Sequence, residues 1–265
     1  MLAAVLLVSG GLTGILAGLF GVGGGALMVP VLFEAFGFLG VADSVRMQLA
    51  VGTSLAIIIP TSLRSYYGHF SRGAVDTTLL RSWALPIIFG VVLGVVIARY
   101  TEPVVMQIVF IAVAGINAIK LISGTTRWNI ADDLPKGLLL RSYGGMIGLL
   151  SSLMGIGGGQ IANIIMTLHG RAIHQAVATS AGIGVLISVP GAIGYVLAGW
   201  GRGDLPVDAI GFVSLLGVAL FLPTTFLTAN LGVRLAHRLS RRNLEIAFGV
   251  FLACVSLRFV FVILS

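Results

Sequence analysis

Charged residues are scarce in this sequence of 265 residues. Asp, Glu, Lys and Arg together make up 9% of the chain, against roughly 25% in an ordinary soluble domain. Hydrophobic residues make up 57%. This composition excludes a typical soluble globular protein and indicates a membrane protein.

Three further absences narrow the function. The chain has a single cysteine, Cys254, which excludes an intrachain disulfide and argues against thiol chemistry. The first residues, "MLAAVLLVSGG", have no basic region of the kind that opens a secretory signal, so we interpret them as part of the mature protein. No G-x-x-x-x-G-K-[ST] motif is present, which argues against ATP as the energy source. The sequence predicts neither a cofactor nor a metal site.

Apolar segments fill most of the sequence. Most of them approach the roughly 20 residues that a helix needs to cross a bilayer, but the segment at 156–168 is clearly shorter. The ten segments are 2–20, 22–39, 47–63, 82–98, 104–122, 138–154, 156–168, 175–200, 208–232 and 244–263. Trp83 and Trp200 are typical of anchors at the membrane interface.

The sequence contains an internal repeat. "GLFGVGGG" at 18–25 returns as "SLMGIGGG" at 152–159, and "AVGTS" at 50–54 returns as "AVATS" at 176–180. Two more pairs keep the same order, at 72–75 with 202–205 and at 93–100 with 231–238. Chance likeness between glycine-rich helices would explain one such pair, but not four in order. We therefore divide the chain into a first repeat at 1–122, a polar linker at 123–137 and a second repeat at 138–265.

The basic residues predict how the two repeats lie in the membrane. With five apolar segments in each repeat, an odd number, the second repeat is inverted relative to the first. Twelve Lys and Arg residues then lie on one side of the membrane and three on the other, which identifies the first side as cytoplasmic. The sequence thus predicts an all-α polytopic membrane protein of two inverted repeats. Each repeat has a glycine-broken hairpin plus three transmembrane helices. The linker is cytoplasmic, and both termini are outside.

The same count explains the net charge of +7 as topology, so we expect no nucleic-acid partner. The expected partners are the lipid bilayer, a small anionic substrate and, as a candidate, a coupling ion or proton.

The two glycine clusters are the first candidate binding elements. A break in a membrane helix exposes backbone N–H and C=O groups, which lipid cannot satisfy, so such a break lines protein or a water-filled cavity. An apolar helix follows each cluster, and the free N–H groups at a helix N-terminus favour an anion. The alternative is that the glycines only allow close helix packing. The candidate residues are Gly21, Gly23, Gly24, Gly25, Gly155, Gly157, Gly158 and Gly159.

Uncharged polar residues inside apolar segments are the second candidate elements, because polar groups are costly in lipid and tend to face a pathway. A Thr-Ser pair occupies the same repeat position twice, as Thr53–Ser54 and Thr179–Ser180. Gln160 and Asn163 follow the second cluster. The alternative is that the hydroxyls bond within their own helix or join two helices. Candidates for a proton-carrying or gating role are His174 and Gln48.

The elements "GLFGVGGGALMVPVL" with "MQLAVGTSL", and "SLMGIGGGQIANIIM" with "HQAVATSAG", resemble the sulfite exporter TauE/SafE family of membrane permeases over nearly the whole chain. The resemblance implies a transporter of the bacterial or archaeal plasma membrane. It implies sulfite or other sulfur-containing anions as substrates, with the glycine clusters and both Thr-Ser pairs as functional elements. The two half-sites differ chemically, because Ile164 stands where the first half has Pro30 and His174 where it has Gln48.

These observations together predict a permease, not an enzyme. It would move a small anion, namely sulfite or another sulfur-containing oxyanion or organosulfonate, by alternating access around the paired glycine breaks. A non-transporting accessory subunit is an alternative that the residues leave open. An intramembrane hydrolase using Ser180 and His174 is disfavoured, because six residues turn a helix by roughly 600° and place the two side chains on different faces.

Overall fold

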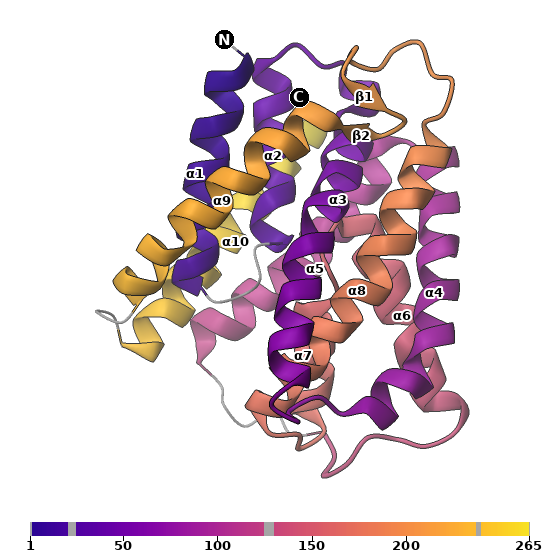
Figure 1. Ribbon diagram of the computed structural model, residues 1–265, viewed down its shortest axis with the longest axis vertical. Helices are drawn as coiled ribbons and strands as arrows, with labels where there is room; N and C mark the ends of the chain where they lie inside the picture. The colour runs from indigo at the N-terminus through magenta and orange to yellow at the C-terminus, as the bar shows by residue number, and fades with distance from the viewer. Residues whose placement is uncertain (1, 21–24, 125–129, 237–239, 265) are drawn as a thin grey trace.

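The computed structural model describes the chain except for residues 1, 21–24, 125–129, 237–239 and 265. The described residues form ten helices and one two-stranded hairpin (Figure 1). The helices are α1 (Leu2–Phe20), α2 (Gly25–Phe38), α3 (Asp43–Phe70), α4 (Thr77–Tyr100), α5 (Pro103–Ser123), α6 (Leu138–Met154), α7 (Gly159–Leu168), α8 (Ile173–Ala198), α9 (Leu215–Ala236) and α10 (Arg241–Leu264). The strands β1 (Ala209–Ile210) and β2 (Val213–Ser214) lie between α8 and α9. The predicted all-α class is confirmed.

Five of the helices, α3, α4, α5, α8 and α10, are long and apolar enough to cross a membrane. A helix is the form that such a segment takes in lipid, because it pairs its backbone groups internally. Large apolar side chains on the outer faces of these helices are exposed, as Leu85 and Phe89 on α4 illustrate. Surfaces of this kind suit contact with lipid tails better than contact with water. The fold is that of a polytopic membrane protein.

Two of the helices, α2 and α7, are short and run away from each other. They have 14 and 10 residues, well below the roughly 20 that span a bilayer. The end of α2 lies beside the loop that carries Asp204 and Asp208. The end of α7 instead receives a hydrogen bond from the linker, where Ile130 N lies 2.9 Å from Leu168 O. Figure 1 shows the hairpin and the outer ends of α1 and α10 at one end of the molecule and the α3–α4 loop at the other.

The packing of the helices is symmetric between the first five and the last five. If α1 to α5 are exchanged in order with α6 to α10, the same helix pairs are obtained. Thus α1 packs on α9 and α6 packs on α4, while α3 packs on α8 and α5 on α10. Glycines allow the closest of these contacts. A Cβ atom on Gly90 of α4 would lie 2.1 Å from Gly145 O of α6, and one on Gly148 would lie 2.2 Å from Ile87 O. Small residues let membrane helices approach in this way.

The segment before α9 corrects one sequence prediction. The apolar stretch 208–232 is not one continuous helical segment, because β1 and β2 pair as an antiparallel hairpin before the helix begins at Leu215. Gly211 turns the hairpin with φ +55°, a conformation that glycine adopts without strain. Ser214 then caps α9, since its Oγ accepts a hydrogen bond from Gly217 N at 2.9 Å.

Trp83 and Trp200 were both predicted to be anchors at the membrane interface. Trp200 is exposed, as such an anchor would be, but Trp83 is not. Trp83 is fully buried between α4 and α6, and its Nε1 donates to Leu140 O at 2.7 Å. The indole therefore serves helix packing, because the carbonyl of α6 supplies the hydrogen-bond partner that a buried Trp needs.

Candidate functional site

The starts of the two short helices meet in the interior of the molecule. A Cβ atom on Gly25, the first residue of α2, would lie 3.2 Å from Gly157 N and 3.3 Å from Ile156 Cα. A cavity of about 160 Å³ lies beside this meeting point, and Gly25, Gly157 and Gly159 all contribute to its wall. The positive ends of two helix dipoles are therefore directed toward one cavity.

Uncharged polar side chains form much of the remaining wall. They come from three helices, namely α7 with Gln160 and Asn163, α3 with Thr61, Ser62 and Ser65, and α8 with Ser180. Apolar groups such as Ile58 and Val177 complete it. Oδ1 of Asn163 is buried without a hydrogen-bond partner. No Asp, Glu, Lys or Arg lines the cavity within the described part of the chain.

Several wall hydroxyls donate back to their own helices. Thr61 Oγ1 donates to Ile58 O at 2.8 Å, and Ser180 Oγ donates to Val177 O at 2.9 Å. Their protons are thus engaged, as is common for hydroxyls in membrane helices. The groups at the cavity wall that can still donate include the side-chain amides of Gln160 and Asn163 and the first backbone amides of α7. In α7 the first amide to bond to a carbonyl is Ala162 N, which donates to Gly158 O.

The second glycine break, at 155–159, contains two positions whose backbone conformation suits only glycine. Gly155 and Gly158 have φ of +65° and +70°, where a side chain would be strained. Gly155 O accepts a hydrogen bond from Ser54 Oγ of α3 at 2.9 Å. The backbone carbonyl that the break exposes is thereby satisfied within the protein, as membrane depth requires.

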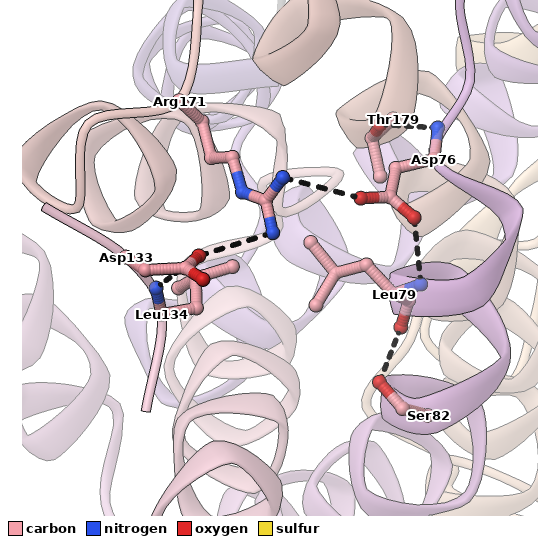
Figure 2. Close-up of polar contacts among 7 residues, drawn as sticks. All are labelled: Asp76, Leu79, Ser82, Asp133, Leu134, Arg171 and Thr179. Atoms are coloured by element: carbon pink, nitrogen blue, oxygen red, sulfur yellow. Dashed lines mark hydrogen bonds and ion pairs between the residues drawn. The ribbon is translucent and has the colours of Figure 1, made fainter. Parts of the chain in front are cut away.

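The two threonines of the Thr-Ser pairs make equivalent contacts. Thr53 Oγ1 of α3 accepts a hydrogen bond from Ser214 N at 3.0 Å, and Thr179 Oγ1 of α8 accepts one from Asp76 N at 3.0 Å. Ser214 caps α9, and Asp76 caps α4 by accepting from Leu79 N at 2.9 Å. Figure 2 shows the second of these contacts. Each threonine therefore joins a central helix of one half to a helix start in the other half.

Asp76 also takes part in an ion-pair network (Figure 2). Arg171, in the loop before α8, lies between two carboxylates, 4.0 Å from Asp76 and 3.2 Å from Asp133 of the linker. Leu134 N donates to the same Asp133 carboxylate at 2.8 Å. The network ties the linker, the start of α4 and the loop between α7 and α8 together at one end of the molecule.

A family model described as sulfite exporter TauE/SafE matches residues 6–259. The chain belongs to the sulfite exporter TauE/SafE family. A probable membrane transporter protein of Haemophilus influenzae is 31% identical over 252 residues, which cover 95% of each chain. A probable membrane transporter protein of Methanocaldococcus jannaschii is 27% identical over 259 residues, covering 97% of this chain and 95% of the relative. No solved structure matches.

Family and relatives agree that this TauE/SafE chain is a multi-pass membrane transporter and not an enzyme. The hydrolase alternative is thereby set aside. The helical architecture agrees with that conclusion, since five helices are long enough to span a membrane.

The cavity brings together six of the sixteen residues that the sequence predicts for the TauE/SafE site. Those in its wall are Gly25, Gly157, Gly159, Gln160, Asn163 and Ser180. Outside the wall are Gly155, Gly158, Ser54, Thr53, Thr179, His174 and Gln48. His174 is exposed at the start of α8, while Gln48 is buried in α3 with Oε1 unpartnered. Gly21, Gly23 and Gly24 lie outside the described residues.

Sequence reasoning placed Thr53 and Ser54 of α3 in the site but did not select the α3 residues that line the cavity. Thr61, Ser62 and Ser65 line the cavity, and they follow Ser54 at intervals of seven, eight and eleven residues. That spacing is one stripe of a helix. Extending the stripe from Ser54 along α3 would have found them.

We expect Thr53→Val to destabilise the TauE/SafE protein rather than to weaken anion binding directly. Valine has nearly the same shape but cannot accept from Ser214 N, and leaving such a buried group unpaired costs about 1–3 kcal/mol. Thermal unfolding in detergent should show a lower Tm for Thr53→Val than for Thr53→Ser, which keeps the hydroxyl. An unchanged Tm combined with lost anion binding would return Thr53 to the binding site that the sequence predicts.

Proposed function

We propose that the chain is a permease that moves a small anion by alternating access around the paired glycine breaks. The proposed substrate is sulfite or another sulfur-containing oxyanion or organosulfonate. The observation that carries the proposal is the meeting of two helix N-termini at one uncharged cavity. Helix N-termini at broken membrane helices bind anionic groups of substrates in other transporters.

The chemistry of the wall supports an anion that binds and then leaves. The donors include the amides of Gln160 and Asn163 and the first backbone N–H groups of α7. An anion would accept hydrogen bonds from them without meeting a fixed positive charge. Transport needs binding that is favourable but weak enough for release. A neutral wall of donors meets that requirement better than an arginine would.

The size of the cavity supports a small substrate. One water needs ~10–15 Å³ of comparable volume, so about 160 Å³ corresponds to roughly ten waters. A small oxyanion fits with part of its hydration, or with a short organic group against the apolar wall near Ile58 and Val177.

The repeated contacts support two inverted repeats at 1–122 and 138–265 as the basis of the proposed mechanism. The caps Asp76 and Ser214 lie 138 residues apart, as do the segments 93–100 and 231–238. Each cap donates its backbone N–H to a threonine, and those threonines lie 126 residues apart. The opposite directions of α2 and α7 agree with an inversion. In such transporters one repeat moves against the other around a fixed site.

The proposed orientation, in a bacterial or archaeal plasma membrane, has both termini outside and the linker in the cytoplasm. We expect an impermeant maleimide to label Val207→Cys in intact cells, and Ser71→Cys only after permeabilisation. Both positions are exposed, Val207 between α8 and β1 and Ser71 between α3 and α4. Cys254 is itself exposed, so both variants are made in a Cys254→Ser background. Labelling of both cysteines in intact cells would contradict this topology.

Flux of sulfite into liposomes that contain only the purified chain tests the proposed function. Transport by this chain alone excludes an accessory subunit, and no flux of any sulfur-containing anion would contradict the permease. Imposing a pH or sodium gradient in the same liposomes determines whether a proton or an ion is coupled. His174 and Gln48 remain the predicted candidates for a proton-carrying or gating role.

A further inference from the structure

The cavity adjoins the contact between α3 and α8 at one of two equivalent places and not at the other. The repeat places residues 126 positions apart in equivalent places on the two helices, so Ser65 corresponds to Gly191 and Ala181 to Leu55. Ser65 and Ala181 both line the cavity. The equivalent pair is in contact, because a Cβ atom on Gly191 would lie 2.9 Å from Cδ1 of Leu55. The cavity therefore reaches only one of two equivalent places along this helix pair, where Gly182 of α8 still packs against Tyr66 of α3 beside it.

Apart from Ile58 and Gly184, the α3 and α8 residues that correspond to wall residues are buried and lie outside the wall. Ser62 and Ser180 of the wall correspond to Ser188 and Ser54, each of which is 0% exposed. Val177 of the wall corresponds to Val51, which is also 0% exposed. Two residues that correspond to each other, Ile58 and Gly184, belong to the wall already. Because each is the equivalent of the other, these two residues lie at the centre of the correspondence between α3 and α8.

Ser188 carries the strongest sign that the second, buried place opens. Its hydroxyl is fully buried and has no hydrogen-bond partner. Leaving such a group unpaired costs about 1–3 kcal/mol, and an apolar residue would avoid that cost. A buried hydroxyl at this position is explained if it contacts water or substrate in a second conformational state. Its counterpart Ser62 lies in a cavity wall in the present state.

We propose that Ser54, Leu55, Ser188 and Gly191 line a second access cavity on the opposite side of the glycine breaks. It opens when Leu55 separates from Gly191, while the observed cavity closes between Ser65 and Ala181. This inference rests on the proposed alternating access. It adds the specific path by which the site reaches the other face of the membrane. The contact between Leu55 and Gly191 is the gate of that path.

Cysteine labelling tests the second cavity. In a Cys254→Ser background, Ser62→Cys and Ser188→Cys form a pair matched by the repeat. We expect an impermeant maleimide to label Ser62→Cys only in inside-out vesicles and Ser188→Cys only in right-side-out vesicles. Ala114→Cys is the control, since Ala114 is buried on α5 and does not line the observed cavity, and it should resist labelling from either side.

The outcomes separate this inference from the proposed function. Ser188→Cys that stays unlabelled from both sides, in a protein that transports anion in liposomes, would overturn the second cavity and leave the permease intact. Labelling of Ser188→Cys from the same side as Ser62→Cys would also overturn it. Labelling as expected, in a chain that carries no anion, would retain the second cavity and overturn the permease.

A second variant tests the gate without placing a cysteine in the proposed second cavity. Gly191→Leu prevents the present contact with Leu55 and is expected to hold the second cavity open. Labelling of Ser62→Cys in inside-out vesicles should then be lost, as should anion flux. Gly68→Leu is the control, because nothing lies within 4 Å of a Cβ atom at that position of α3. Unchanged labelling of Ser62→Cys in a folded Gly191→Leu protein would overturn the gate.

Discussion

Gly159→Val is expected to abolish anion binding and flux while the protein stays folded. A Cβ atom at this position would lie 3.7 Å from Ser180 Oγ, an ordinary contact. Gly159 begins α7 and has no positive φ, so the backbone accepts a side chain. The methyl groups of valine would occupy the cavity beside the first amides of α7. An anion could then no longer reach those donors.

The matched control is Gly115→Val on α5, where nothing lies within 4 Å of the added atom. Both variants should give a single symmetric peak in detergent, and only Gly115→Val should bind and transport sulfite. Gly158→Val would be a poorer test, because its φ of +70° and a contact of 2.2 Å with Ile187 Cδ1 would combine misfolding with lost binding. A folded Gly159→Val protein that still transports would reduce the start of α7 to a packing device.

Gly148→Val is expected to prevent stable folding. A Cβ atom at Gly148 would lie 2.2 Å from Ile87 O and 3.0 Å from its carbonyl carbon. These are backbone atoms, so the clash is relieved only if α4 and α6 move apart. Forcing even small groups into a packed core costs about 1–3 kcal/mol, and separating two helices along their glycines costs more. We expect little monodisperse protein and a large drop in Tm.

Gly145→Val is the control on the same helix, one turn earlier, because a Cβ atom there would lie 3.7 Å from Pro86 O. It should purify and unfold much like the wild type. Equal Tm values for Gly148→Val and the wild type would contradict the close approach of α4 to α6. The two glycine experiments together distinguish glycines that line the site from glycines that join helices.

Much of the fold is predictable from the sequence, because each membrane-spanning helix corresponds to a long apolar segment of the sequence. The ends of α6 at Leu138 and Met154 coincide with the predicted segment 138–154. The hairpin before α9 was not predicted, since Ala209 to Ser214 are as apolar as a helix and only Gly211 marks the turn. Trp83 was misplaced because a tryptophan near a helix start looks the same whether it faces lipid headgroups or a neighbouring helix.

The candidate site was only partly predictable, because its wall depends on which face of each helix turns inward. The glycine cluster at 155–159 was visible as a break, and Gln160 and Asn163 follow it directly. The threonines of the Thr-Ser pairs were predicted to bind substrate, but their structural partners are backbone amides distant in sequence, of Ser214 and Asp76. Contacts over such separations leave no local pattern. The repeat itself was the one sequence signal that pointed to them.

The position of a bound anion tests the account most directly. Selenite is a heavier analogue of sulfite, and its anomalous scattering locates it in crystals of the purified protein. We expect a peak between the starts of α2 and α7, within hydrogen-bond distance of the Gly159 and Gln160 amides. A peak found only at exposed arginines, with the cavity between the glycine breaks free of selenite, would contradict the account.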